Sequence, residues 1–549
     1  MHPRDIPRAL LERSGEQVQA LTFPYVRSPD QDASTPAHHQ VVVVGAGPVG
    51  LTLAIDLAQR GQKVLVLDND HRLSIGSRAL CFAKRTLEIW DRLGVGQQMV
   101  DKGVSWNVGR VFFKEGQVFE FNLLPEAGHE RPAFINLQQY YCEAYLLERL
   151  LRLPNAEVRW GNKVIGIATQ DDGALLTIET PEGNYQMAAG WVVASDGGRS
   201  TMRNLMGLES KGRIFQDRFL IADVKMKAQF PAERWFWFDP PFHPNQSVLL
   251  HREPDDVWRI DFQLGWDADP EEEKKPERII PRVKALLGKD VEFTLEWASV
   301  YTFACLRMDQ FVHGRVIFAG DSAHGVSPFG ARGANSGVQD AENLAWKLDW
   351  VLKSRAGAEL LATYGAEREF AADENILNST RATDFITPKS EVSKLFRNAV
   401  LGLAQQHGFA RRIVNSGRLS VPATLTTSSL NTNDVDAFAC RQVPGAVLTD
   451  APVVLADGSR AWLLRQLGRD FTALVFGEAP AWLAEFPEVS TLVVGKEVVD
   501  ASGLVRERLD AAPGTLYLIR PDQHICARWK SPTRERFSSA LARATAKAH

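Results

Sequence analysis

The hydrophobic pattern divides the chain into segments of different periodicity. After a mixed polar stretch, the apolar run Val41–Val44 leads into a glycine turn and then into a helical pattern over residues 51–58. A second apolar run occupies residues 63–67. A buried strand, a tight turn, a helix and another buried strand are the parts of a parallel βαβ unit, so we expect an α/β domain to begin here.

Residues 213–300 follow another pattern, in which apolar and polar positions alternate. Within residues 257–264 the apolar side chains share one face of an expected strand and the polar side chains share the other. This pattern predicts an antiparallel sheet that forms a wall of a substrate pocket, and an ordinary half-buried sheet is the alternative. The candidate substrate residues from this region are Trp235, Trp237, Arg259, Asp261 and Gln263.

At 549 residues the chain is too long for one hydrophobic core, so we expect several domains. Residues 1–40 read as a mobile or surface-wrapping arm, and a linker rich in Ser, Thr and Asn precedes a separate α/β unit near the C-terminus. The expected divisions are the arm at 1–40, the first part of the α/β domain at 41–212, the sheet domain at 213–300, the second part with a helical segment at 301–430, and the C-terminal unit at 437–549.

Charge and composition exclude several classes of partner. The chain has 63 Lys and Arg against 67 Asp and Glu, a formal net charge of −4, so it carries no electrostatic signature for nucleic acid or an anionic membrane. No apolar run approaches the length that spans a bilayer. The 5 cysteines are scattered without metal-type spacing. We therefore expect a cytoplasmic protein without a metal site, a disulfide framework, a membrane partner or a nucleic-acid partner.

The glycine turn has the spacing of a dinucleotide-binding motif. Gly45, Gly47 and Gly50 form GxGxxG with Pro48 inside it, between the expected strand and helix. Asp68 ends the next strand, 18 residues after Gly50, close to the offset of about 20 at which a carboxylate binds an adenosine ribose. A glycine turn used only for tight packing is the alternative, but the strand, helix and acid together favour a dinucleotide.

A second loop, residues 320–335, brings a strand end, several glycines and an expected helix start to one place. It begins Gly320-Asp321 and passes through Pro328 and Arg332 before the helix. Such a point offers backbone N–H groups and a positive helix terminus to an anion or a developing negative charge. Between the two loops, Asp196-Gly197 follows another buried strand, which suits a close backbone approach to a ligand.

These three motifs, in this order, resemble the single-component FAD-dependent aromatic hydroxylases of the p-hydroxybenzoate and phenol hydroxylase type. The resemblance covers residues 41–400, and the C-terminal unit is similar to the thioredoxin-like extension of the phenol and hydroxyphenylpropionate hydroxylase branches, without CxxC. It implies a Rossmann-like FAD-binding domain with an inserted antiparallel-sheet domain. The partners we expect are a small aromatic substrate and a second copy of the chain in a homodimer.

The resemblance also implies roles for individual residues. The cofactor-binding residues are Gly45, Gly47, Pro48, Gly50, Asp68, Arg78, Gln139, Asp196, Asp321, Pro328, Gly333, Ala334 and Asn335. Asp68 would bind the adenosine ribose, and Arg78 and Gln139 the ribityl–phosphate region. Asp321 would bind the ribityl hydroxyls. Pro328 would lie at the reactive edge of the flavin, the backbone of 333–335 at its N1/C2=O locus, and Arg332 would add positive potential there, with a surface charge as the alternative.

The implied chemistry uses FAD, NADH or NADPH as the electron donor, and O₂, with hydroxylation through a C4a-hydroperoxyflavin. No second strand–GxGxxG–helix unit appears, so the nicotinamide would bind transiently. The phenol hydroxylase branch carries an acid before its RTLE-like stretch, whereas this chain has Leu80-Cys81-Phe82 there. The catalytic base therefore stays unassigned.

Three rival functions remain open on the sequence. Residues 235–240 approach the WxWxIP signature of flavin-dependent halogenases, but Asp239 stands at the isoleucine position. Epoxidation or Baeyer–Villiger oxidation of a polyketide-like substrate is possible within the monooxygenase class. An FAD-binding sensor without turnover would not need the Pro328 loop.

Overall fold

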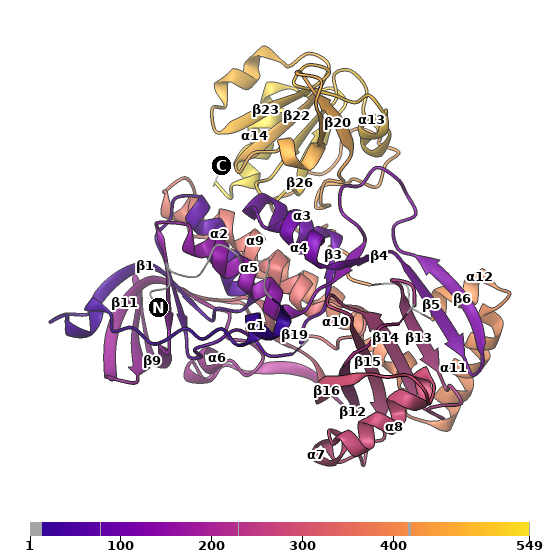
Figure 1. Ribbon diagram of the computed structural model, residues 1–549. Helices are drawn as coiled ribbons and strands as arrows, with labels where there is room; N and C mark the ends of the chain where they lie inside the picture. Colours follow the sequence, from indigo (N-terminus) through magenta and orange to yellow (C-terminus); the bar gives the residue numbers. More distant parts are fainter. Residues whose placement is uncertain (1–13, 77, 229, 415–418, 548–549) are drawn as a thin grey trace.

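The structure is a computed structural model that describes residues 14–76, 78–228, 230–414 and 419–547. Three large sheets with their helices account for most of it, and a three-stranded sheet lies between them (Figure 1). The C-terminal unit, coloured yellow and orange, lies over the helices of the first sheet. The chain therefore has the mixed α/β architecture that the hydrophobic pattern predicts.

The first sheet carries the glycine motif. Its strands follow the order β17-β18-β11-β1-β2-β8, with β10 and β9 continuing from β11. β1 pairs in parallel with β11 and β2 through valines buried on both faces, as expected where helices cover a parallel sheet. The bounds are β1 Ala37–Val44, α2 Pro48–Gln59, β2 Val64–Asp68, α5 Gln139–Leu151, β8 Ala156–Trp160, β9 Lys163–Gln170, β10 Gly173–Thr180, β11 Gly183–Ala194, α6 Thr201–Leu205, β17 Val312–His313 and β18 Val316–Phe318.

The described part of the N-terminal arm lies against the first sheet. It contains α1 (Gly15–Gln19) and η3 (Pro29–Asp32), and Val18 and Phe23 are buried. Phe23 stacks on Trp160 with ring centroids 4.6 Å apart. β1 begins at Ala37, inside the range predicted for the arm, because residues 37–40 continue the pairing with β11.

The second sheet is mainly antiparallel and follows the order β19-β16-β12-β15-β14-β13-β5-β6. It extends beyond the predicted range of 213–300, because β12 and β16 are long and the hairpin β5/β6 joins it through a parallel pair with β13. The bounds are β5 Val108–Phe113, β6 Gly116–Asn122, β12 Ser210–Lys225, β13 Arg234–Phe238, β14 Ser247–Arg252, β15 Val257–Leu264, α7 Pro270–Glu273, α8 Pro276–Leu287, β16 Thr294–Met308 and β19 His324–Gly325.

A small sheet of order β3-β7-β4 lies between the two large ones. It comprises β3 Cys81–Ala83, β4 Val104–Trp106 and β7 Phe134–Asn136, with α3 Lys84–Leu93 and α4 Gly96–Lys102 beside it. It sets the segment after β2 against the second sheet. As a result, Gly76 lies so close to Trp297 that a Cβ there would come within 2.3 Å of the indole.

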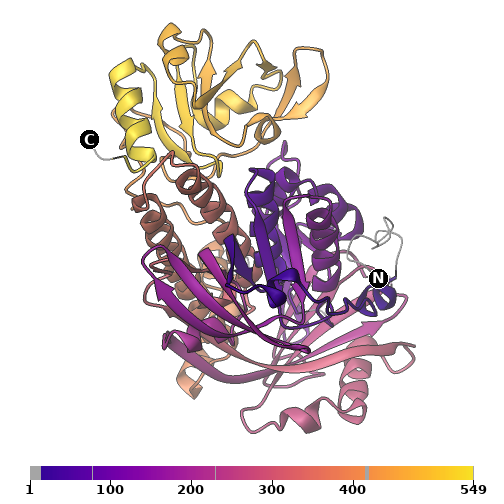
Figure 2. The same cartoon turned by 90° about the vertical axis from the view of Figure 1, so that its left-hand side faces the viewer.

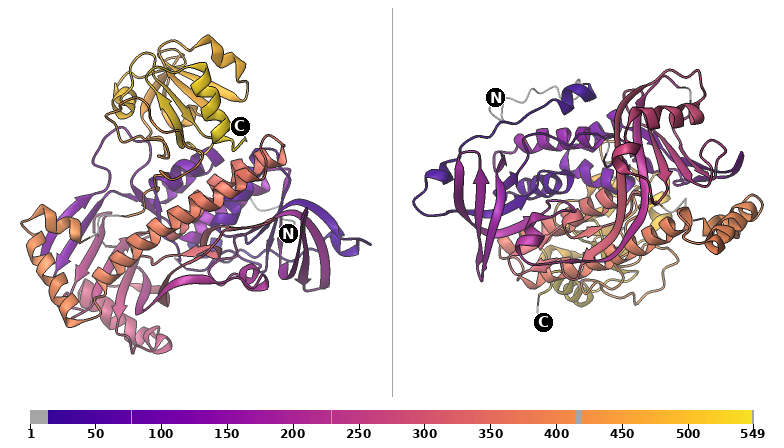
Figure 3. Two further views of the ribbon diagram at one scale, coloured as in Figure 1. Left: turned by 180° about the vertical axis from the view of Figure 1, so that it is seen from behind. Right: turned by 90° about the horizontal axis from the view of Figure 1, so that it is seen from below.

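Four helices follow the second sheet: α9 Gly333–Leu352, α10 Glu359–Ile386, α11 Glu391–Ala404 and α12 Gly408–Ile413. α9 and α10 pack against one another, as the brown pair in Figure 2 shows. Seen from behind, α10 crosses the molecule to the edge strand β6, where α11 packs (Figure 3). α10 therefore joins the first sheet, the second sheet and the C-terminal unit.

The C-terminal unit has its own sheet of order β21-β20-β24-β23-β22-β25-β26. β22 pairs in parallel with β23 and antiparallel with β25. The bounds are β20 Pro452–Leu455, β21 Arg460–Trp462, η5 Leu463–Gln466, β22 Phe471–Phe476, η6 Ala481–Glu485, β23 Val489–Val494, β24 Val498–Val499, α13 Leu504–Leu509, β25 Leu516–Ile519, β26 Ile525–Trp529 and α14 Arg534–Ala544.

A buried ionic cluster joins this unit to α9 and α10. Arg520 pairs with Glu367 of α10 at 2.5 Å, and Lys347 of α9 pairs with the same carboxylate at 2.7 Å. Asp522 accepts a further bond from Arg520 at 2.5 Å. Because charges buried without partners are strongly destabilising, this cluster fixes the C-terminal unit in one position on α9.

No helix in the described ranges is both long and apolar enough to cross a membrane.

Candidate functional site

The glycine motif folds into a tight turn with one open side. Gly45 has φ 110°, and a Cβ there would lie 2.5 Å from the Ser195 carbonyl oxygen. A Cβ on Gly50 would lie 2.0 Å from the Gly45 carbonyl oxygen. A Cβ on Gly47, the N-cap of α2, would meet nothing within 4 Å. Gly45 and Gly50 therefore allow strand and helix to touch, while the open side at Gly47 exposes the first-turn amides of α2 to a ligand.

Asp68 and Asp196 lie at strand ends next to this turn. Asp68 accepts hydrogen bonds from the backbone N–H of Ala46 at 2.6 Å and of Asp70 at 2.8 Å. Asp196 accepts from Ser200 Oγ at 2.6 Å and from Met202 N–H at 2.9 Å. The Asp68 carboxylate stands at the edge of the glycine turn, whereas the Asp196 carboxylate fixes the start of α6.

The second loop packs on α2 through glycines. A Cβ on Gly320 would lie 2.9 Å from Val49 Cγ2, and a Cβ on Gly337 would lie 2.6 Å from the same atom. The start of α9 therefore approaches the start of α2 closely. Both helices point their positive N-terminal ends toward the region between the two loops, and Asp321 is exposed to solvent there.

A buried cluster under the second loop holds its shape. Asp340 of α9 accepts from His324 Nε2 at 2.6 Å, from Arg368 Nε at 2.6 Å and from Gly320 N–H at 2.9 Å. Burial by itself raises the pKa of Asp340, but His324 and Arg368 lower it to about 2. Asp340 is therefore an anion at neutral pH that ties the loop to α9 and α10.

Gly333, Ala334 and Asn335 form the first turn of α9, with Arg332 as its N-cap. The Asn335 amide is buried and occupied: its Oδ1 accepts from Ala83 N–H at 2.8 Å and from Thr86 Oγ1 at 2.6 Å. Its Nδ2 donates to the Cys81 carbonyl at 2.8 Å. The side chain fixes α9 against β3 and α3, and only the backbone N–H groups of this turn are available to a ligand.

We expect Asn335→Ala to lower the free energy of unfolding by about 2 kcal/mol, because it leaves buried donors and an acceptor without partners. Chemical denaturation of the purified protein measures this. Asn204→Ala on α6 is the matched control, since Asn204 is an exposed helical asparagine. Equal stabilities of the two variants would contradict the role given to Asn335.

Pro328 is exposed, whereas Arg332 is 2% exposed. Nη1 of Arg332 donates to Asn375 Oδ1 of α10 at 3.4 Å. Next to Pro328, Phe329 is buried and its ring packs on Phe219 and Phe303 of the second sheet, with centroids 4.8 and 5.3 Å away. The alternative that Arg332 is a surface charge is wrong, and its effect on the flavin stays a prediction.

The structure gives Gln139 and Arg78 local partners. Gln139 Oε1 accepts from Ala79 N–H at 2.9 Å, and its Nε2 donates to Glu143 at 2.7 Å. Arg78 is exposed, and its carbonyl accepts from Arg259 Nη1 at 3.4 Å. Gln139 therefore positions the segment that carries Arg78, and Arg259 links this segment to the second sheet.

The five predicted substrate residues do not lie together. Cross-strand pairing places Trp235 beside Ile260 and Trp237 beside Phe262, through the strand between them. Trp237 belongs to the apolar cluster that also contains Ile279 and Val283 of α8. Because side chains alternate along a strand, the two tryptophans face α8, and the three polar candidates lie on the other face of the sheet. A role of these five residues in substrate binding stays a prediction.

The opposite, inner face carries Arg259, Asp261 and Gln263 and turns toward β3 and α9. Arg259 pairs with Asp261 at 2.8 Å. Two residues not named from the sequence, Arg234 of β13 and His251 of β14, are buried on the same face. The alternation that placed Trp235 and Trp237 on one face places Arg234 on the other, so the pattern contained this signal.

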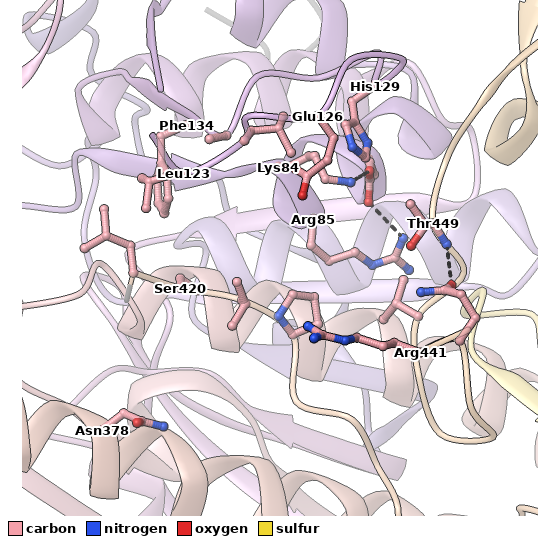
Figure 4. Close-up of a pocket in the computed structure, with 18 of the residues that line it drawn as sticks. Lys84, Arg85, Leu123, Glu126, His129, Phe134, Asn378, Ser420, Arg441 and Thr449 are labelled. Atoms are coloured by element: carbon pink, nitrogen blue, oxygen red, sulfur yellow. Dashed lines mark hydrogen bonds and ion pairs between the residues drawn. The ribbon is translucent and has the colours of Figure 1, made fainter. Parts of the chain in front are cut away.

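A cavity of about 1170 Å³ lies between the first domain, α10, α12 and the C-terminal unit. In Figure 4, Leu123 and Phe134 form an apolar end, and Arg441 and Thr449 enter from the C-terminal unit. Its basic residues are Lys84, Arg85, His129, Arg381, Arg411, Arg412, Arg441 and Arg508. Ser420 of the cavity wall donates to the Gly330 carbonyl at 2.8 Å, so the cavity borders the second loop.

These features fit FAD. The open turn at Gly47 and the α2 amides suit a pyrophosphate, and Asp68 stands at the distance along the chain where a ribose is bound. The amides at the start of α9 suit the negative charge of a reduced flavin.

Comparisons with known proteins agree with an FAD-binding protein. The FAD binding domain family matches residues 38–379. A 6-methylpretetramide 4-monooxygenase from Streptomyces rimosus is 31% identical over 525 residues, 89% of this chain and 90% of the relative. A 3-(3-hydroxy-phenyl)propionate/3-hydroxycinnamic acid hydroxylase from Mycolicibacterium gilvum is 28% identical over 524 residues, 89% of this chain and 88% of the relative. The solved structure of the flavin-dependent monooxygenase PieE with FAD and substrate has a TM-score of 0.82 at 20% identity and covers 94% of this chain and 100% of that one.

Proposed function

This chain belongs to the family of FAD-dependent monooxygenases, and on that premise we propose that it hydroxylates a phenolic or similarly activated aromatic compound. The electron donor is NADH or NADPH, and O₂ is the second substrate. Both reported relatives are named as a monooxygenase or hydroxylase, and the name of one contains a hydroxyphenyl group.

One observation carries the proposal. Through Phe329, the Pro328 loop packs on a sheet face that combines phenylalanine rings with buried arginines. The rings of Phe219 and Phe303 offer an apolar surface to an aromatic ring, and Arg234 and Arg259 offer positive charge to an oxygen on it. Such a surface orients an electron-rich ring and excludes water from it.

We propose the following roles for the cofactor-binding residues. Bound FAD supplies hydride acceptance from the nicotinamide and oxygen activation. Asp68 binds the adenosine ribose, Asp321 the ribityl hydroxyls, and the N–H groups of residues 333–335 the N1/C2=O locus. Pro328 borders the reactive edge, and the Arg332 charge, 2% exposed at the N-cap of α9, adds to the positive potential of that terminus.

The cavity beside the second loop is the proposed route of the substrate. It has apolar walls and several cations, which suits an aromatic compound with an acidic group. Burial, Lys84 and Arg508 lower the pKa of His129 to about 4. His129 is therefore neutral at pH 7, and the arginines supply the positive charge of the cavity.

For the C-terminal unit we propose a thioredoxin-like domain with a structural role. Support comes from the parallel pair β22/β23, the antiparallel β25 and β26 beside it, and the closing helix α14. Cys440 and Cys526, its two cysteines, are far apart in sequence and form no CxxC. We further propose a cytoplasmic homodimer, consistent with the free state of all five cysteines.

A substrate screen tests the proposal. Phenols, hydroxybenzoates and aryl-propionates are mixed with the holoenzyme, and NADH and NADPH oxidation is recorded together with product mass. We expect at least one phenol to stimulate oxidation and gain one oxygen. Product NMR separates ring hydroxylation from epoxidation or ring expansion, which add the same mass. Dependence on chloride with a chlorinated product would overturn the proposal in favour of halogenation.

A further inference from the structure

Arg234 is a buried cation to which the described part of the chain gives no partner. The residue is 7% exposed, and its guanidinium makes no hydrogen bond or ion pair with any residue in the described ranges. Asp261, the carboxylate whose charge acts on Arg234, already pairs with Arg259 at 2.8 Å. An uncompensated buried charge is strongly destabilising, so such groups are normally paired with an anion. Arg234 therefore points to an anion that belongs to a ligand.

His251 lies next to this arginine on the inner face. It is 4% exposed and pairs across the strands with Arg259. Burial, Arg234 and Arg259 hold the pKa of His251 well below its ordinary value. The imidazole is therefore neutral at pH 7 and can accept a proton.

A chain of hydrogen bonds assigns the tautomer of His251. The Asn136 amide donates through Nδ2 to the Arg252 carbonyl at 2.8 Å, so its Oδ1 is the acceptor for Trp106 Nε1, 2.8 Å away. The same Oδ1 accepts the thiol proton of Cys81 at 3.2 Å.

The Cys81 sulfur can then accept from His251 Nδ1–H, which lies 4.0 Å away, at the long limit for sulfur. Burial raises the pKa of Cys81 to about 11, so the thiol keeps its proton. With Nδ1 protonated, the lone pair of the neutral ring is on Nε2. His251 thus presents a proton acceptor beside the Arg234 cation.

His251 and Arg234 lie next to the region proposed to bind the flavin. The Cys81 carbonyl accepts from Asn335 Nδ2 in the first turn of α9, so Cys81 lies between that turn and His251. On the other side, Arg259 donates to the carbonyl of Arg78, a proposed cofactor-binding residue. A ring held between this sheet face and a flavin bound at the start of α9 would lie beside both His251 and Arg234.

We propose that His251 and Arg234 together ionise the phenolic substrate, which supplies the base that the sequence leaves unassigned. The phenol O–H bond breaks, its proton forms an N–H bond at His251 Nε2, and the electron pair stays on oxygen as a phenolate held by Arg234. No oxidant is needed, and the ionised ring is a stronger nucleophile. This inference rests on the proposed function, because it names the activation of that substrate.

The charges beside His251 hold the imidazole neutral before the substrate binds, because Arg234 and Arg259 both act against its protonation. A phenolate bound to Arg234 offsets that cation, so the imidazolium that forms meets less positive charge. Asp261, Asp223 and Glu253 act on Arg259, and Asp223 pairs with it across the strands. Recognition of a substrate carboxylate by Arg234 alone is the alternative that an experiment must separate.

Binding of 4-nitrophenol to the holoenzyme separates ionisation of a phenol from recognition of a carboxylate. The absorbance of 4-nitrophenol reports its ionisation without turnover. One pH unit below the pKa of the free phenol, we expect the wild type to bind it with the phenolate spectrum. Arg234→Met and His251→Asn, the second of which keeps a donor toward Cys81, should bind only the neutral form, about tenfold more weakly. Arg110→Met is the matched control, since Arg110 pairs with Glu233 on the outer face and should retain the phenolate spectrum.

Flavin content and thermal unfolding of each variant verify folding, and Arg234→Lys, which keeps the charge, should restore part of the phenolate signal. A neutral spectrum in the wild type, no binding, or competition by benzoate without any phenolate signal overturns the inference. A phenolate spectrum together with no hydroxylated product from any phenol would overturn the proposed function and leave the ionisation by His251 and Arg234 supported.

Discussion

Gly50→Ala is expected to reduce FAD affinity at least about tenfold, so that the purified protein retains little flavin. The added Cβ would lie 2.0 Å from the Gly45 carbonyl oxygen and 2.6 Å from Ser195 Oγ. Because the first contact is with backbone, α2 has to move away from β1 and β11. Overpacking of this kind costs about 1–3 kcal/mol, and the same movement displaces the α2 amides that are proposed to bind the pyrophosphate.

Flavin absorbance relative to protein absorbance, followed by titration of the apoprotein with FAD, measures the effect. Gly402→Ala is the control, because Gly402 lies in α11 with nothing within 4 Å of its added Cβ. Alanine is a better helix former than glycine by about 1 kcal/mol, so this variant should be as stable as the wild type and keep its flavin. Normal flavin content in Gly50→Ala would contradict the position given to the glycine motif.

Asp340→Asn is expected to lower the free energy of unfolding by about 3–5 kcal/mol, the usual consequence of removing one partner from a buried ion pair. Arg368 would keep its buried charge without an anion, and the hydrogen bond that holds Gly320 would weaken. Urea unfolding of the apoprotein at neutral pH measures this. Asp373→Asn, which removes only a pair with Arg307 at an exposed site, should cost less than about 1 kcal/mol.

The pairing of Asp340 also predicts that the free energy of unfolding depends on pH. The pKa of Asp340 is lowered to about 2 in the folded protein, against about 3.9 in an unfolded chain. A carboxylate whose folded pKa is depressed stabilises the protein above its unfolded pKa, and this contribution is lost as the pH falls toward the folded value. The wild type should therefore lose about 2 kcal/mol more than Asp340→Asn between pH 5 and pH 2. Parallel stability curves for the two proteins would contradict the assigned pairing.

Local features were predictable from the sequence because short segments encode them. Buried valines, three glycines and a terminal acid specify a strand, turn, helix and strand wherever they occur, and the structure confirms β1, α2 and β2. The helix that begins after the second loop, α9, follows for the same reason. Membership of the FAD-dependent monooxygenase family, and with it the cofactor, was likewise readable from three motifs.

Only the tertiary structure decided which elements pack on each face of the second sheet. Alternation separated Trp235 from Arg234, but it could not say which face turns toward β3 and the segment that carries Arg78. Helix α8 packs on the face that carries the tryptophans, which leaves the Arg234 face for the other elements. Because α8 is a separate segment, the pattern of the strands does not reveal this packing. The halogenase-like aromatic run is thereby explained as core packing.

The surroundings of His251 and Arg234, the proposed ionising pair, could not be predicted from local patterns either. Cys81 and His251 are 170 residues apart, and Asn136, which orients them, comes from a third strand. Periodicity gives the direction of a side chain relative to its own strand. Contacts between distant segments depend on how sheets and helices pack, which one sequence read locally does not contain. The sequence determined the cofactor and the class of chemistry, and the packing of the second sheet on β3 and α9 determined which residues lie together at the proposed substrate site.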